Sequence, residues 1–156
     1  RKFHELENVS LENYLPAKKI DTKLKNLKWI NSSFKGNVEK EIGLIKKGIL
    51  ILNNQREEIM VISHYLFLDS LTSNNLNYPN RAFTFDGTNT PLKNNKYYEY
   101  YKNFLLKNIE LKNIKKIYFF NHENLPKEII TDYIDKSCYE IEKEEIFYIF
   151  ELRCNN

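Results

Sequence analysis

Two short runs of consecutive apolar residues constrain the fold more than any other feature of this sequence. The first runs from Ile59 to Ile62 and is followed by Ser63, and the second runs from Ile117 to Phe120. Polar residues flank both runs. Strands buried on both faces of a sheet have this composition, and such strands belong to parallel sheets that helices cover. The runs therefore predict two inner strands of a parallel sheet.

Helical patterns precede and follow these strands. Apolar residues recur at helical spacing from Val38 to Leu52, behind Asn37 as an N-cap. A short helix is predicted at 65–71, the clearest helix at 95–112, and a last one from Pro126 to about Asp135, where the proline lies in the first turn. Gly43 and Gly48 weaken the first of these helices, by up to about 1 kcal/mol each relative to Ala. We expect these glycines to permit close packing on the sheet.

The remaining strands complete a fold prediction. Residues 81–85 alternate weakly and suggest a further strand, while 139–142 and 146–152 alternate around a charged turn and predict a hairpin. Alternating helices and strands predict right-handed crossovers and helices on both faces. We therefore expect an α/β fold, three-layer and Rossmann-like, with a mostly parallel sheet and a C-terminal antiparallel hairpin. Residues 1–19 are predicted to be a lead-in, and 20–156 a single domain.

Charge and motifs exclude several functions. The 24 basic and 21 acidic residues give a net charge of +3, and lysines alternate with glutamates along the predicted helices. Nucleic-acid binding usually requires basic residues gathered on one face, so we expect no nucleic-acid partner. The four glycines do not supply a dinucleotide-binding fingerprint, and no phosphate-binding loop or zinc-protease motif occurs. We therefore expect no cofactor and no metal.

The two cysteines, Cys138 and Cys154, leave the redox compartment open. A two-residue turn at Lys143 and Glu144 would place Cys138 opposite Ile149, several residues short of Cys154. A disulfide would then require the chain to double back, which favours two free thiols.

Polar residues at the ends of the predicted strands form the candidate site. In open α/β sheets, ligands bind beyond the carboxyl ends of the strands. His64 follows the first strand, Asp86 the second, and His122 and Glu123 the third. These four side chains suit acid–base chemistry or metal binding. The alternative is that polar residues gather wherever strands end, and we favour it.

Arg81 and a tyrosine cluster complete the candidates. Arg is rare in this chain, so the planar fork of Arg81 could clamp a carboxylate or phosphate, or it could pair with Asp86 to hold the loop. The pairing is favoured. The tyrosines could stack on sugars or bases, although packing between core and surface is the expected role; they are Tyr97, Tyr98, Tyr100 and Tyr101.

Several short motifs together resemble a known type of domain. They are Leu27-Lys28-Trp29-Ile30, Met60 to Tyr65, Pro79-Asn80-Arg81, Lys96-Tyr97 with Tyr100-Tyr101, and Ile114 to Tyr118. Between Leu27 and Leu152 the chain resembles the C-terminal soluble domain of bacterial multi-spanning membrane glycosyltransferases that use lipid-linked sugars. Leu66 stands where that pattern tends to have Gln.

The resemblance implies a non-catalytic domain on the extracytoplasmic face of the membrane. It would assist in binding or positioning the acceptor or the glycolipid, for example a polyprenyl-phosphate-linked sugar. Its first partner would be the membrane part of the same polypeptide, and the start at Arg1 rather than Met fits such an excised segment. No catalytic residue carries over onto this sequence. The alternative is a free-standing, cytoplasmic α/β hydrolase or transferase that uses the residues at the strand ends.

Overall fold

The computed structural model describes residues 14–30, 37–81 and 89–154 of the chain. The chain forms two compact units, one ending at Leu52 and the other beginning at Asn53. In the described part of the chain, no helix is both long enough and apolar enough to cross a membrane.

The first unit consists of a small antiparallel pair of strands and a long helix. Strand β1 (Leu15–Pro16) pairs with β2 (Lys28–Trp29), and the 3₁₀ turns η2 (Ala17–Lys19) and η3 (Thr22–Leu24) lie between them. The helix is α1 (Val38–Asn53). The indole nitrogen of Trp29 donates a hydrogen bond of 3.0 Å to the buried carboxylate of Glu41, which ties β2 to α1.

Helix α1 begins where the sequence predicts. The side-chain oxygen of Asn37 accepts a hydrogen bond of 2.6 Å from the amide of Lys40, which confirms Asn37 as the N-cap. The predicted apolar face is buried at Ile42, Ile45, Ile49 and Leu52. The expected role of Gly43 is wrong, because this glycine is exposed and a Cβ atom there would meet no atom within 4 Å. Gly48, in contrast, is buried.

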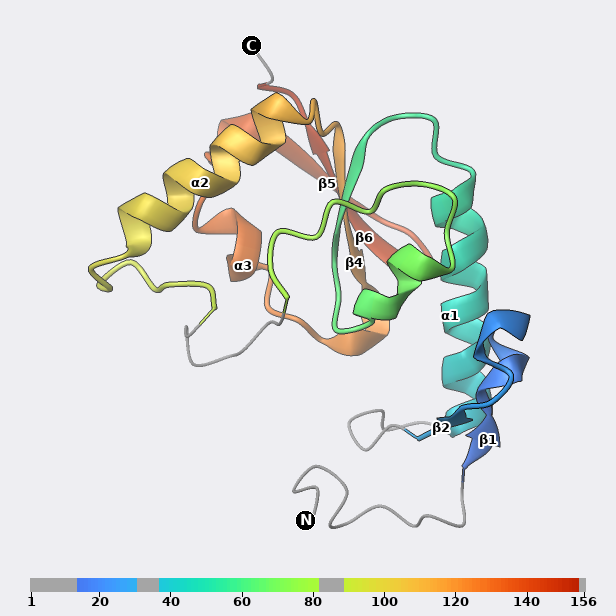
Figure 1. Cartoon of the computed structure of the whole chain (residues 1–156). Helices are drawn as coiled ribbons and strands as arrows, with labels where there is room; N and C mark the ends of the chain where they lie inside the picture. The colour runs from blue at the N-terminus through green and yellow to red at the C-terminus, as the bar shows by residue number, and fades with distance from the viewer. Residues whose placement is uncertain (1–13, 31–36, 82–88, 155–156) are drawn as a thin grey trace. The chain divides into compact units, whose positions relative to one another are not determined.

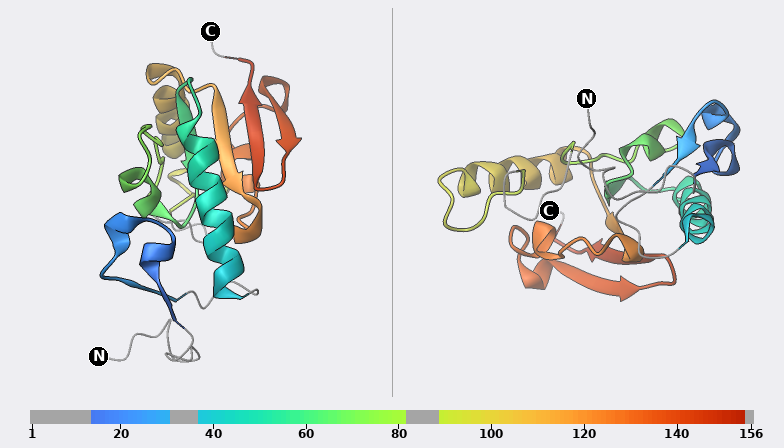
Figure 2. Two further views of the ribbon diagram at one scale, coloured as in Figure 1. Left: turned by 90° about the vertical axis from the view of Figure 1, so that its right-hand side faces the viewer. Right: turned by 90° about the horizontal axis from the view of Figure 1, so that it is seen from below.

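The second unit is built on a four-stranded sheet. Its strands are β3 (Ile59–Ile62), β4 (Lys116–Phe120), β5 (Tyr139–Lys143) and β6 (Phe147–Leu152), in the order β3-β4-β6-β5. Among the described strands of this sheet, only β3 and β4 run parallel, while β6 is antiparallel to both β4 and β5. The hairpin of β5 and β6 is the pair of red strands in both views of Figure 2. All five residues of the edge strand β5 are at least partly exposed.

The prediction of a three-layer, Rossmann-like and mostly parallel sheet is therefore wrong. Among the described strands of this sheet, antiparallel pairs outnumber the single parallel pair. The prediction failed because a continuous apolar run indicates that a strand is buried but not which direction it runs. Helices α2 (Tyr98–Leu111) and α3 (Glu128–Thr131) lie on the same side of the sheet (Figure 1). Both join one apolar cluster with the sheet residues Met60, Ile62, Ile117 and Phe119.

Other predicted elements differ in extent. The predicted helix at 65–71 is the 3₁₀ turn η4 (Leu66–Ser70), and the helix predicted from Pro126 to Asp135 is regular only in the single turn of α3. Two further 3₁₀ turns are η5 (Asn121–Glu123) and η6 (Lys136–Cys138). Of the strand suggested at 81–85, only Arg81 is described, so that prediction lies outside the described residues.

The two cysteines form a disulfide, so the preference for free thiols is wrong. The amide of Glu144 donates a hydrogen bond of 2.9 Å to the carbonyl of Phe147, so the turn lies two residues further along the chain than predicted. Tyr139 consequently pairs with Leu152. This register sets Cys138 beside the residues that follow β6, and the Cα atoms of Cys138 and Cys154 are 4.8 Å apart.

Candidate functional site

The predicted site at the carboxyl ends of the strands, which we call the rim, forms because β3 and β4 are parallel neighbours. Their register pairs Ile62 with Phe119, so the residues that follow the two strands emerge at the same edge of the sheet. His64 lies just beyond β3, and His122 and Glu123 lie in η5, directly after β4. The structure therefore brings together three of the five predicted residues.

Tyr65 joins the two strand ends through its side chain. Its hydroxyl lies 3.0 Å from Nε2 of His122, and its ring lies 5.6 Å from those of His122 and Phe120, measured between centroids. Tyr65 itself is buried, and its amide donates to the hydroxyl of the fully buried Ser63. His122 is thus held by a buried tyrosine, a contact that positions its ring.

Glu123 joins the same two ends through the backbone. Its Oε1 atom accepts a hydrogen bond of 2.7 Å from the amide of His64. Partial burial lowers the pKa of the His64 ring, which favours the neutral imidazole. Burial and, after it, the charges of Glu123 and Asp69 raise the pKa of Tyr78, whose hydroxyl donates to the carbonyl of Tyr65. The contacts of His122 and Glu123 therefore hold loops together at this rim.

Arg81 and Asp86 do not complete the predicted site. Arg81 is exposed, and among the described residues no hydrogen bond or ion pair to it is seen. Asp86 lies outside the described residues, so the predicted pairing with Arg81 stays a prediction. The neighbouring Asn80 is engaged instead, because its amide donates a hydrogen bond of 2.7 Å to the hydroxyl of Tyr101. Burial raises the pKa of Tyr101 to about 12.

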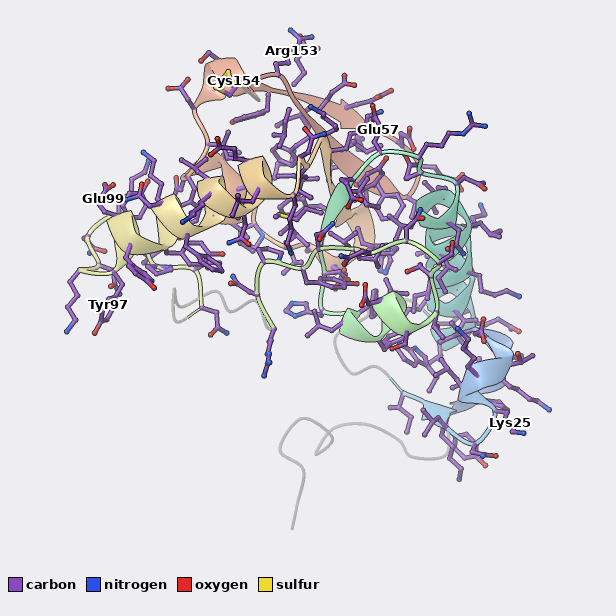
Figure 3. The ribbon with its side chains drawn as sticks, turned by 45° about the horizontal axis from the view of Figure 1, so that its top comes forward. Lys25, Glu57, Tyr97, Glu99, Arg153 and Cys154 are labelled. Carbon is purple, nitrogen blue, oxygen red and sulfur yellow. A yellow bond between two sulfur atoms is a disulfide. The ribbon has the colours of Figure 1, made fainter. Side chains whose placement is uncertain are left out.

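A pocket that the sequence did not predict lies between α2 and the disulfide. Its volume is about 750 Å³, and the side chains of α2 form one wall. The disulfide, the end of β6 and the residues that follow α3 form the other wall, close to the labelled Cys154 in Figure 3. Apolar side chains line its floor: Leu106, Ile109, Ile134 and Leu152. Polar side chains surround them: Lys102, Asn103, Lys107, Glu110 and Asp135.

This pocket lies at the opposite end of the sheet from the rim. The amide of Leu152, in the pocket wall, donates a hydrogen bond to the carbonyl of Lys115, which immediately precedes β4. The rim residues follow the other end of β4. The sequence signal was the spacing of Lys102, Leu106 and Ile109 on one helical face, but the opposite wall comes from residues more than twenty positions away.

No residues arranged for metal binding are found in the described part of the chain, where no group of three or more His, Cys, Asp or Glu side chains could hold an ion. The polar atoms of the pocket can instead form hydrogen bonds of both kinds. Lys and Asn side chains donate, and carboxylates accept, around an apolar floor. No known protein family, no curated protein and no solved structure matches this chain.

Proposed function

We propose that this chain is a non-catalytic binding domain that holds the acceptor or the glycolipid of a membrane glycosyltransferase. The observation that carries the proposal is the pocket between α2 and the disulfide. A sugar offers hydroxyl donors and acceptors together with apolar ring faces, and a prenyl chain adds purely apolar surface. The pocket presents partners for each, namely lysine and asparagine donors, carboxylate acceptors and an aliphatic floor.

The disulfide supports placement of this domain outside the cytoplasm. Disulfides persist in exported proteins and are rare in the reducing cytosol, and Cys138 and Cys154 are bonded. The strand-end rim supports a non-catalytic role. His122 and Glu123 use their side chains to hold neighbouring loops, so the rim gives less support to the alternative of a free-standing enzyme.

Ligand-detected NMR tests the proposal with a short-chain prenyl-phosphate mannose as the probe. Mannose alone and the prenyl phosphate alone, in separate arms, show which part of the probe is recognised. We expect binding of the whole probe to the oxidised chain and recovery of the probe unchanged. Conversion of the probe by the chain alone would contradict a non-catalytic role.

Substitutions locate the binding. Leu106→Trp fills the pocket and is expected to weaken binding at least about tenfold, because a bulky ring occupies space that the ligand needs. Leu50→Trp makes the same change at an exposed leucine of α1, outside the pocket, and is the matched control. Equal binding by both variants would exclude the pocket. Loss of binding in His64→Gln, with none in Leu106→Trp, would instead favour the rim and the enzyme alternative.

A further inference from the structure

The outward face of α2 carries large apolar side chains that the fold does not bury. Tyr97, Tyr100, Phe104 and Leu111 are 56%, 76%, 45% and 73% exposed, and we call these four residues the apolar stripe. Residues advance by about 100° along a helix, so these four lie within about 60° of one another on one face. The buried residues of α2, Tyr98, Leu105 and Ile109, lie on a different face.

Lysines border the apolar stripe, and acidic residues lie farther from it. Lys96 and Lys107 flank one side and Lys112 flanks the other, all exposed. The two acidic residues of α2, Glu99 and Glu110, lie beyond Lys96 and Lys107, about 80° to 100° around the helix from the nearest stripe residue, Tyr100. Figure 3 shows Tyr97 and Glu99 on opposite sides of the beginning of α2. Among the described residues, no ion pair engages Lys107 or Lys112.

We propose that this face of α2 docks on an anionic lipid surface. Tyrosine and phenylalanine suit the boundary between headgroups and acyl chains, and lysines beside them attract acidic headgroups. A second copy of the chain is a poorer occupant. A symmetric dimer through the apolar stripe would set the lysine borders of the two copies against each other. The inference goes beyond the proposed function and does not depend on it, because none of the four stripe residues lines the pocket, although the border residue Lys107 lies at the edge of both.

Vesicle sedimentation of the whole chain tests this inference without any glycolipid. We expect binding to vesicles of phosphatidylglycerol and phosphatidylcholine in equal amounts, weak binding to pure phosphatidylcholine, and release by added salt. Tyr100→Ser combined with Leu111→Ser should reduce the partition coefficient at least about tenfold. Lys107→Gln and Lys112→Gln should each reduce it about fivefold.

Matched controls distinguish binding through the apolar stripe from non-specific association with vesicles. Leu50→Ser combined with Leu92→Ser removes two exposed leucines from other segments, and Lys40→Gln combined with Lys46→Gln removes two exposed lysines from α1. These controls should bind like the unaltered chain. Circular dichroism melting checks that every variant folds, which we expect because all the altered side chains are exposed.

Two outcomes would overturn the inference. One is vesicle binding that the stripe variant leaves unchanged, or that is equal on neutral vesicles. The other is a dimer in sedimentation velocity that only the stripe variant dissociates, without vesicle binding, which would assign the face to a second copy. Neither outcome bears on the pocket, whose soluble probe is measured without vesicles.

Discussion

At the scale of single residues, Gly43 lowers the stability of α1, and no close packing around it requires a glycine. The residue lies inside α1, is exposed, and leaves open space around a hypothetical Cβ atom. Glycine in a helix interior is less favourable than alanine because the unfolded chain has more freedom to lose.

Gly43→Ala is therefore expected to raise the free energy of unfolding by about 1 kcal/mol. Urea unfolding followed by circular dichroism measures the change, with Gly43→Ser as a weaker helix former for comparison. Destabilisation by alanine would show that this position needs the absence of a side chain.

His64 is the residue whose environment makes stability depend on pH. Its pKa in the folded chain lies below the ordinary value of 6.5, because partial burial disfavours the charged ring. As the pH falls below 6.5, the unfolded chain binds this proton before the folded chain does. The contribution of His64 to stability is therefore unchanged above that pH and decreases below it.

An NMR titration should give a lower pKa for the His64 ring in the folded chain than for the same ring in the chain unfolded in guanidinium chloride. Urea unfolding on either side of pH 6.5 should show a smaller loss of stability in His64→Asn than in the unaltered chain. A folded-state pKa at or above the unfolded value would contradict the assignment.

At the scale of elements, the C-terminal hairpin shows what the sequence could predict and what it could not. The apolar and alternating patterns located β5 and β6, because burial of one face leaves a period of two in the sequence. The register was misplaced by two residues at the turn. The turn residues are Glu145 and Ile146, neither of which has the backbone preference of Gly or Asn that would fix a hairpin turn.

The disulfide that follows from this register should stabilise the hairpin. Cys138 and Cys154 are separated by 16 residues, and cross-linking a loop of that size stabilises a fold by about 3 kcal/mol. Cys138→Ser combined with Cys154→Ser should lower the free energy of unfolding by about that amount. The unaltered chain with its disulfide reduced is the matched comparison. A difference below about 1 kcal/mol would show that the hairpin is already closed in the unfolded ensemble.

The rim could be predicted from the sequence, whereas the pocket could not. His64, His122 and Glu123 could be placed together because the residues after parallel strands meet at one edge. The contact between Tyr65 and His122 depends on side-chain directions that no pattern contains. The pocket required the packing of α2 against a segment bearing Cys138 and Cys154, so it could be found only from the folded chain.

At the scale of the whole molecule, the buried tyrosines set an alkaline limit to stability. Burial is the main cause that raises the pKa of Tyr78 and Tyr133, and it raises those of Tyr101 and Tyr118 to about 12. Between the ordinary value of 10.0 and these values, the unfolded chain loses protons that the folded chain retains. Stability is therefore expected to decrease as the pH rises through that range.

Two measurements across the same pH range test this effect. One is tyrosinate absorbance in the absence of urea, and the other is the midpoint of urea unfolding. A steep rise in absorbance should coincide with unfolding, when the buried hydroxyls become accessible to solvent. Tyr118→Phe should flatten the alkaline decrease in stability, whereas Tyr100→Phe should not. Equal slopes in both variants would contradict the role of the buried hydroxyls.

The exposed edge strand β5 affects whether the protein aggregates at high concentration. An edge strand presents unpaired backbone groups that can recruit a strand from another molecule and start a growing fibre. Here Glu140, Glu142 and Lys143 stand along that edge, and Glu140 also pairs with Arg153. Bringing two such edges together would oppose like charges and strip water from them. These charged residues of β5 thus act as gatekeepers against fibre formation.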